Sequence, residues 1–417
     1  MKVCLCLLLC ITISLGLVIG CSLDLSSDNI SDNIPNTKSA NNITTNKVDS
    51  DFVSRNTEFA FKIFRQINSE DKDKNIIISP ISISTALAMT YQGAQSTTKE
   101  VMAKTLEYTN MDLETLNENY KNILQYLNRL DKKVELNMAN SIWIRDGEPI
   151  LENFLSVNKE YYYAFIEELD FSKDSAAHTI NDWISQATKQ KIKEMIEPPI
   201  APETLMYLIN AIYFKGEWTK KFDEKNTYNA PFHGGDGSTQ DVMMMTLNGE
   251  VEYGQGNDFQ VVRLPYGKGD LAMYCILPES ETPINEFVEN LDKEKWDDIK
   301  SSIEQTNDVI LKIPRFKLEY GIKSLKNCLI DLGMEEAFSD MADFSGIRND
   351  LSIYDVLHKA VIEVNEKGSE AAAATVVEMR VTSALEPTIF SADRPFVFII
   401  ADLKTDSILF IGKVYSL

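Results

Sequence analysis

The chain reads VNEKGSEAAAATVVEMRVTSALEPTIFSADRP over residues 364–395, and no single secondary structure suits all of it. Alanine is the best helix former and Ser369 is a good helix N-cap residue, so the alanine run after Glu370 could form an exposed helix. The β-branched Val376 and Val377 favour a strand instead. Gly368 stands just before the run and is a natural hinge, because glycine reaches backbone conformations that are closed to other residues.

A strand with a period of two sorts this stretch into two chemically different faces. One face carries small or uncharged side chains, namely Ser369, Ala371, Ala373, Thr375, Val377 and Met379. The other face carries every charge, namely Glu370, Glu378 and Arg380. Such a strand could enter a sheet with its uncharged face buried and its charges in water. The alternation therefore predicts a segment able to join a sheet, and the exposed alanine-rich helix is the alternative.

This stretch and the sequence RPFVFIIADLKTDSILFIGKV at 394–414 resemble the reactive loop and C-terminus of the serpins. The likeness continues through NIIISPISISTALAMTYQGAQSTT (75–98), INDWISQATKQKI (180–192), TLMYLINAIYFKGEW (204–218) and IPRFKLEY (313–320), and it covers residues 51–417. The resemblance implies an α+β serpin fold with three β-sheets, about eight or nine helices and an exposed reactive-centre loop.

Local patterns agree with that fold. Phe59, Ile63 and Ile67 share one helical face, and residues 113–127 show the pattern of an amphipathic helix. The sequence at 75–80 indicates a short buried strand ended by Pro80, followed by a helix at 82–91. VELNMANSIWIR at 134–145 alternates as a strand, and 204–218 is apolar on both faces through Phe214, as a strand covered on both sides must be.

The function follows from the resemblance. In serpins a target protease cleaves the reactive loop, and the small-residue segment then inserts into the main sheet as an extra strand. The chain is thus expected to be no enzyme but an inhibitor of serine-type endopeptidases, a suicide substrate that traps its target as an acyl-enzyme. Three alternatives stay open: a non-inhibitory serpin with a carrier, chaperone or storage role, an inhibitor of papain-like cysteine proteases, and a surface adhesion or scaffold protein.

The family's motifs assign roles within the loop. The hinge that enters the sheet comprises Glu366, Gly368, Ser369, Glu370, Ala371, Ala372, Ala373, Ala374 and Thr375. The family's usual hinge length, counted from Glu366, puts the scissile bond at Thr382-Ser383. Counting back from Pro395 moves the bond by a residue or two, and the alternatives are Val381, Ala384 and Arg380. The small or β-branched residues favour an elastase- or subtilisin-like protease as the partner, whereas Arg380 would suit a trypsin-like one.

A polar cluster beneath the main sheet is expected to hold that sheet closed. The resemblance places His358 on the strand that feeds the loop and joins it to Ser79, Ser82 and Asn210. Buried polar groups must find partners, so a small network can pin two strands together until insertion separates them. Trp218 matches the family's tryptophan at the top of the sheet, where insertion begins. The alternative for His358 and Trp218 is an ordinary core residue.

The N-terminus has the pattern of an exported lipoprotein. Residues 1–20 contain one basic residue, Lys2, and then an apolar run, which is typical of a secretory signal, with a membrane span as the alternative. VIGC at 18–21 looks like a lipobox, so Cys21 is predicted to carry a lipid. Residues 21–50 are rich in Ser, Asn and Asp, which predicts a disordered linker of roughly 30 Å. The chain thus resembles a prokaryotic lipoprotein-type serpin with its domain at 51–417, exported and either membrane-anchored at the cell surface or extracellular.

Composition limits the partners and the chemistry. The chain has 417 residues, 44% of them hydrophobic, and its net charge of −22 argues against nucleic acid as a partner. It lacks the G-x-S-x-G and H-E-x-x-H motifs, and His178, His233 and His358 are far apart, so we expect no hydrolytic site, no metal and no cofactor. Cys275 and Cys328 are too few for a disulfide scaffold and are expected to be free, mostly buried thiols. A monomer is expected.

Overall fold

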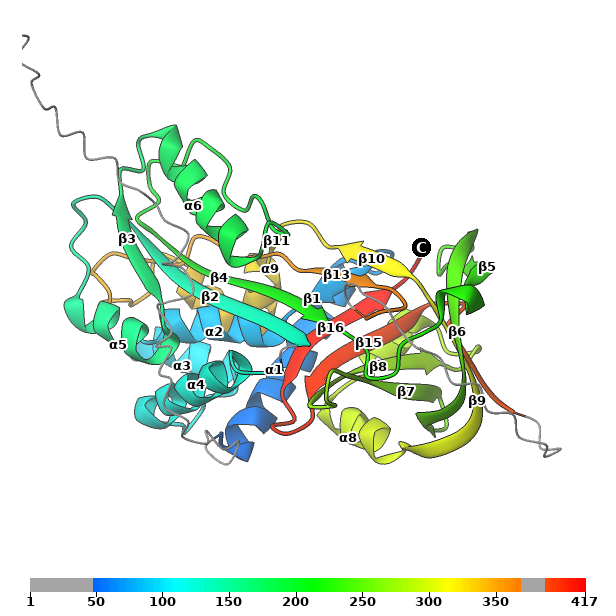
Figure 1. Ribbon diagram of the computed structural model, residues 1–417. Coiled ribbons are helices and arrows are strands. Elements are labelled where there is room, and N and C mark those ends of the chain that lie inside the picture. Colours follow the sequence, from blue (N-terminus) through cyan, green and yellow to red (C-terminus); the bar gives the residue numbers. More distant parts are fainter. Residues whose placement is uncertain (1–47, 132, 369–386) are drawn as a thin grey trace, which may run out of the picture.

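The computed structural model describes residues 48–131, 133–368 and 387–417, which pack around one large hydrophobic core and a second, smaller one (Figure 1). The α-helices of these residues are α1 (Ser50–Glu70), α2 (Pro80–Tyr91), α3 (Ser96–Thr105), α4 (Leu113–Leu127), α5 (Glu152–Tyr162), α6 (Asp174–Ala187), α7 (Ile284–Glu289), α8 (Lys293–Ser301) and α9 (Lys326–Leu329). None of these helices is long and apolar enough to cross a membrane.

The N-terminal elements follow the sequence pattern with one difference. Phe59, Ile63 and Ile67 are fully buried along α1, as their spacing predicts. The buried strand β1 (Ile76–Ile78) comes next, and Ser79 caps α2. Pro80, expected only to end the strand, is also the first residue of α2. A proline fits there because the first helical turn does not need its missing N–H group.

Three strands form the sheet that lies against α6 in Figure 1. β2 (Val134–Arg145) is central, with β3 (Phe165–Leu169) parallel on one side and β4 (Met206–Gly216) antiparallel on the other. On the front face Trp143 and Ala211 pack with α6. On the back face Ile212 and Phe214 join the main core. β4 is therefore covered on both faces, as its apolar sequence predicted.

Two short strand pairs lie beside this sheet. β10 (Phe316–Glu319) pairs with β13 (Val361–Val364), and β11 (Lys323–Ser324) pairs with β12 (Leu357–His358), both antiparallel. Among the described residues no strand pairing joins β4 to β13. A groove of about 370 Å³ lies between them, lined by residues of β4, β10 and β13 and by the segment after α6.

The other strands form a nine-stranded sheet in the order β1-β16-β15-β8-β7-β6-β9-β14, with β5 paired to β6. Their bounds are β5 (Tyr228–His233), β6 (Thr239–Gln255), β7 (Phe259–Tyr266), β8 (Leu271–Pro278), β9 (Glu304–Pro314), β14 (Thr388–Ser391), β15 (Phe396–Asp402) and β16 (Ile408–Val414). Every residue of β15 and β16 is buried. The described residues contain four hydrogen-bonded sheets where the resemblance implied three. The long β6 pairs with β5, β7 and β9 and so places these strands in one sheet. Because β4 is not paired with β13 in the described residues, β3-β2-β4 and β10-β13 are separate sheets.

Candidate functional site

Part of the predicted site lies outside the described residues. This part comprises hinge residues 369–375, the scissile-bond candidates Arg380, Val381, Thr382, Ser383 and Ala384, and the predicted lipidation residue Cys21. The described part comprises Glu366, Gly368, Trp218 and the polar cluster of Ser79, Ser82, Asn210 and His358.

Glu366 anchors the start of the hinge through a buried carboxylate. The residue is 3% exposed, and its carboxylate accepts hydrogen bonds from Arg315 Nε at 2.7 and 2.8 Å and from Thr227 Oγ1 at 2.5 Å. Arg315 Nη2 completes an ion pair at 2.5 Å. Burial acts to raise the pKa of Glu366, but the hydrogen bonds from Arg315 and Thr227 outweigh burial and lower this pKa overall. Since Arg315 lies between β9 and β10, the pair ties the hinge to neighbouring strands.

Gly368 packs against the end of β4. Its φ is +130°, and a Cβ atom at this position would stand 2.0 Å from the carbonyl oxygen of Gly216, so only glycine fits here. Gly368 forms one antiparallel bridge with Glu217 and another with Asn365. The backbone at Gly368 is thus antiparallel both to the chain just after β4 and to the chain just after β13.

Trp218 contacts the two residues on either side of Glu366, the first residue of the hinge. The residue is 3% exposed, and its indole Nε1 donates a hydrogen bond to the carbonyl oxygen of Asn365 at 2.9 Å. Its backbone N–H donates to the carbonyl oxygen of Lys367 at 3.0 Å. The indole ring stacks on Tyr266 with a centroid separation of 4.4 Å and an interplanar angle of 14°. Trp218 is therefore both a buried core aromatic and a contact of the chain that leads into the loop.

The structure brings the four predicted polar residues together at the start of α2. The backbone N–H of Ser79 donates a hydrogen bond to His358 Nε2 at 3.1 Å, and Ser79 Oγ donates to the carbonyl oxygen of Leu409 at 2.7 Å. Ser82 Oγ donates to Asn210 Oδ1. Ser82 also donates its backbone N–H to Ser79 Oγ at 3.4 Å, which connects the two halves of the cluster.

Asn210 extends the cluster across the sheet. Its Nδ2 donates to Oδ1 of Asn140, the residue directly opposite on β2, at 2.5 Å. Asn140 Nδ2 in turn donates to the carbonyl oxygen of Tyr162, at the end of α5, at 2.6 Å. These hydrogen bonds tie β4 to the elements around it, so a displacement of β4 would break several of them together.

His358 is held in its neutral form. The residue is 4% exposed, and burial lowers the pKa of its imidazole to about 4. Its Nε2 lone pair already accepts a hydrogen bond from the Ser79 N–H. A proton on Nε2 would point at this N–H, and two donors cannot hydrogen-bond to each other. The Ser79 hydroxyl donates to a backbone carbonyl rather than to this imidazole. The pair is therefore not the nucleophile-and-base arrangement of a hydrolase.

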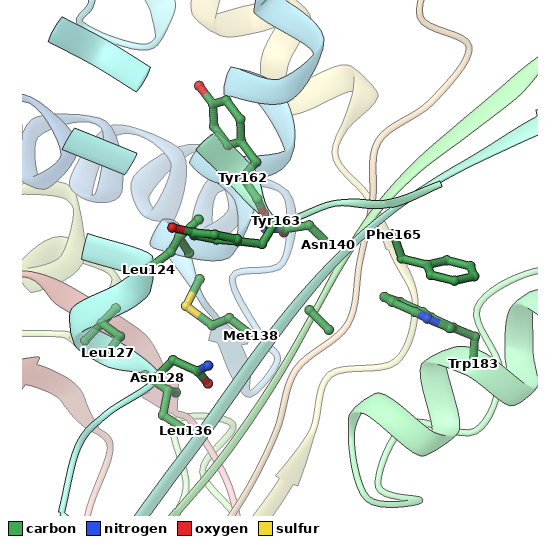
Figure 2. A pocket seen from close by; sticks show the side chains of 11 residues that line it. Leu124, Leu127, Asn128, Leu136, Met138, Asn140, Tyr162, Tyr163, Phe165 and Trp183 are labelled. Carbon is green, nitrogen blue, oxygen red and sulfur yellow. Dashed lines mark hydrogen bonds between the residues drawn. The ribbon is translucent and has the colours of Figure 1, made fainter. Parts of the chain in front are cut away.

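A small pocket lies between α4, the end of α5 and β2, next to Asn140 (Figure 2). Figure 2 shows Tyr163 and Leu124 on one side of β2, and Phe165 and Trp183 on the other. The pocket encloses about 40 Å³ and is lined by Leu124, Leu127, Asn128, Leu136, Met138, Ala139, Asn140, Tyr162, Tyr163, Phe165 and Trp183. This volume holds only a few water molecules, and we assign no organic ligand to it.

The remaining candidate groups show no catalytic or metal-binding arrangement within the described ranges. No set of three or more His, Cys, Asp or Glu residues is grouped there so that it could hold a metal ion. Cys275 and Cys328 are buried free thiols, as predicted, and burial raises the pKa of both. His178 on α6 and His233 on β5 are exposed.

Sequence reasoning missed three residues of the site: Arg315, Thr227 and Asn140. Arg315 stands between the buried Pro314 and Phe316 in IPRFKLEY, and a charge within such an apolar stretch is a signal that it has a partner. Nothing local identifies that partner as Glu366, which lies 51 residues further along the chain. Thr227 and Asn140 carry no comparable signal.

Comparison with known proteins covers most of the chain. A family profile described as Serpin (serine protease inhibitor) matches residues 54–417. An uncharacterised serpin-like protein of Methanosarcina mazei is 36% identical over 374 residues, which are 87% of this chain and 87% of that protein. The leukocyte elastase inhibitor of Xenopus laevis is 36% identical over 373 residues, which are 86% of this chain and 98% of that protein.

A solved structure gives the same result for the fold. The thermophilic serpin tengpin in its native state matches this structure with a TM-score of 0.80 and 33% sequence identity, over 89% of this chain and 95% of that chain. The predicted mixed α+β serpin fold is thereby confirmed. Because the profile matches far more than half of the sequence, the chain belongs to the serpin family.

Proposed function

We propose that this protein inhibits serine endopeptidases as a suicide substrate. The protease's serine hydroxyl attacks the carbonyl carbon of Thr382, an ester forms, and the hydroxyl proton passes to the leaving amine of Ser383. Val381, Ala384 and Arg380 remain the alternative positions for this ester. The segment beginning at Ser369 then enters between β4 and β13 as an extra strand before water hydrolyses the ester.

The pair of bridges at Gly368 is the observation that carries this proposal. Gly368 is antiparallel to Glu217 and to Asn365, so a strand continuing from it would run between β4 and β13. Those strands are not paired with each other in the described residues. Glu217, the residue after β4, continues the alternation that puts Ala211 on the front face, so the continuing strand would turn residue 370 to the front and residues 369, 371 and 373 to the core. This division of faces is the same as the one that the alternation of small and charged residues predicts.

The energy of trapping would come from the inserted strand. Residues 369–381 would span about 40 Å at about 3.3 Å per residue. New hydrogen bonds to both neighbouring strands and the burial of small side chains would stabilise this product. The uncleaved protein is then a kinetically stable form. In this form the Glu366–Arg315 ion pair and the polar cluster around His358 hold the sheet in its present arrangement.

We further propose that a lipid on Cys21 tethers the serpin domain, residues 51–417, to a membrane after residues 1–20 are removed. The lipobox-like VIGC at 18–21 supports this anchor. The linker at 21–50 would then let the inhibitor meet proteases clear of the membrane surface.

The direct test mixes residues 22–417 with elastase, subtilisin and trypsin and resolves the products on denaturing gels. We expect a covalent complex with the elastase- or subtilisin-like enzyme and a released C-terminal peptide that begins at Ser383 when measured by mass. Loop cleavage should also raise the thermal midpoint of the protein by a large amount. Clean cleavage without a covalent band, across a panel that includes a papain-like protease, would instead assign the chain to the non-inhibitory serpins.

A further inference from the structure

The groove between β4 and β13 is lined by many charged residues. On its front face lie Lys191 and Lys193 from the segment after α6, Lys317 and Glu319 from β10, Lys359, and Glu363 from β13. In Figure 1 β4 is green and β13 is orange. Four lysines and two glutamates give this surface a positive balance in a chain whose net charge is −22. A cationic groove in an acidic protein favours an acidic occupant.

The observed registers fix which charges would meet an inserted strand. The antiparallel bridge between Glu217 and Gly368 places residue 370 opposite Lys215 when both strands are followed for two residues. The bridge between Asn365 and Gly368 places residue 370 opposite Glu363 on the other side by the same count. In antiparallel pairs such opposite residues share one face and lie within contact distance.

The same row of charges continues into the outer strands. Lys215 is opposite Glu135 of β2, and Glu135 forms an ion pair with Lys189. Glu363 is opposite Lys317 of β10. An inserted residue 370 would therefore complete a row that crosses five strands. Its two immediate neighbours in that row, Lys215 and Glu363, carry charges of opposite sign to each other.

We propose that Lys215 is a positioning residue for loop insertion, which attracts Glu370 as the first charged residue to enter the sheet, while Glu363 opposes that entry. This inference rests on the proposed inhibitory function and adds to it an electrostatic control of the insertion rate. Lys317 moderates the effect of Glu363 because it lies on the far side of that carboxylate. The occupant of the groove is residue 370 and the segment that follows it in this same chain.

A double-mutant cycle tests the proposal in residues 22–417. Cross-strand charge pairs have modest energies, so Lys215→Met should slow the insertion that follows loop cleavage by about two- to fivefold, and Glu363→Gln should speed it by a similar factor. Both effects should disappear in a Glu370→Gln background. Slower insertion leaves more time for ester hydrolysis, so Lys215→Met should also raise the number of inhibitor molecules consumed per protease trapped.

Two controls separate this mechanism from a general effect of charge or stability. Lys104→Met removes one positive charge from an exposed position on α3 and should leave the insertion rate unchanged. Lys215→Arg keeps the positive charge and should restore the rate. Insertion is monitored as the rise in the thermal midpoint of the protein after cleavage. This measurement needs no covalent trapping of a protease.

The outcomes distinguish the two proposals. If the wild type traps a protease and the Lys215 and Glu363 effects persist unchanged in the Glu370→Gln background, only the positioning role is overturned. If cleaved wild type inserts its loop without trapping a protease, inhibition fails and the same cycle still decides the role of Lys215. If cleaved wild type neither traps a protease nor gains thermal stability, both proposals are overturned.

Discussion

Acidification should weaken the fold through His358. In the folded protein burial lowers the pKa of this imidazole to about 4, whereas an exposed histidine has a pKa of about 6.5. Between these values the unfolded chain binds a proton that the folded protein does not bind. Stability must therefore fall as the pH falls from about 6.5 towards 4.

The size of the effect follows from this pKa difference. One proton bound by the unfolded state alone lowers the free energy of unfolding by about 1.4 kcal/mol for each pH unit. From pH 6.5 to pH 5 the loss is about 2 kcal/mol. His358 is 4% exposed, so solvent screening does not reduce this figure. The Ser79 N–H that points at Nε2 opposes protonation further, because the proton would displace an existing hydrogen bond.

The measurement is urea-induced unfolding at pH 7 and pH 5, followed by tryptophan fluorescence. His358→Gln does not titrate, so its loss of stability on acidification should be smaller than that of the wild type by about 2 kcal/mol. The carboxylates titrate in both proteins, and the difference between the two proteins isolates His358. His233→Gln, at an exposed position, is the matched control and should behave as the wild type does. Equal losses in wild type and His358→Gln would refute the reasoning.

Three further predictions concern the loop, the anchor and the hinge. Ala373→Glu should turn the inhibitor into a substrate, because the new charge would face the core of the sheet. The new charge of Ala372→Glu would face the solvent, so this variant should keep most of the trapping. Equal gel yields of covalent complex for the two variants would contradict the face assignment. Cys21→Ser should release the protein from membranes into the soluble fraction, and continued sedimentation with membranes would sink the lipid anchor. Arg315→Met removes the charge partner of the buried Glu366 and should cost about 2 kcal/mol, less than for a fully buried pair because Arg315 is 39% exposed. Thermal unfolding should show a smaller loss for Arg315→Lys, and equal midpoints for both variants would argue against the ion pair.

Local sequence was sufficient for several of the elements. The alternation in VELNMANSIWIR predicted β2 from residue 134 to residue 145, and the spacing of apolar residues at 113–127 predicted α4, both with the bounds that the structure shows. The family resemblance rested on motifs of this kind spread along the whole chain. Hydrophobic periodicity and secondary-structure propensity depend on residues that are neighbours in sequence, so they can be recognised without the tertiary structure.

The sequence by itself therefore determined several helices and strands and the family, whereas its prediction of two faces for the hinge stays a prediction about residues outside those that the structure describes. Only the tertiary structure decided that Arg315 holds Glu366, that Asn210 donates to Asn140 on the neighbouring strand β2, and that burial keeps His358 neutral. Ser79 and His358 are 279 residues apart, and their hydrogen bond depends on how β12 and α2 pack together. Partner choice and desolvation arise from contacts between distant segments, so no pattern within one segment can specify them.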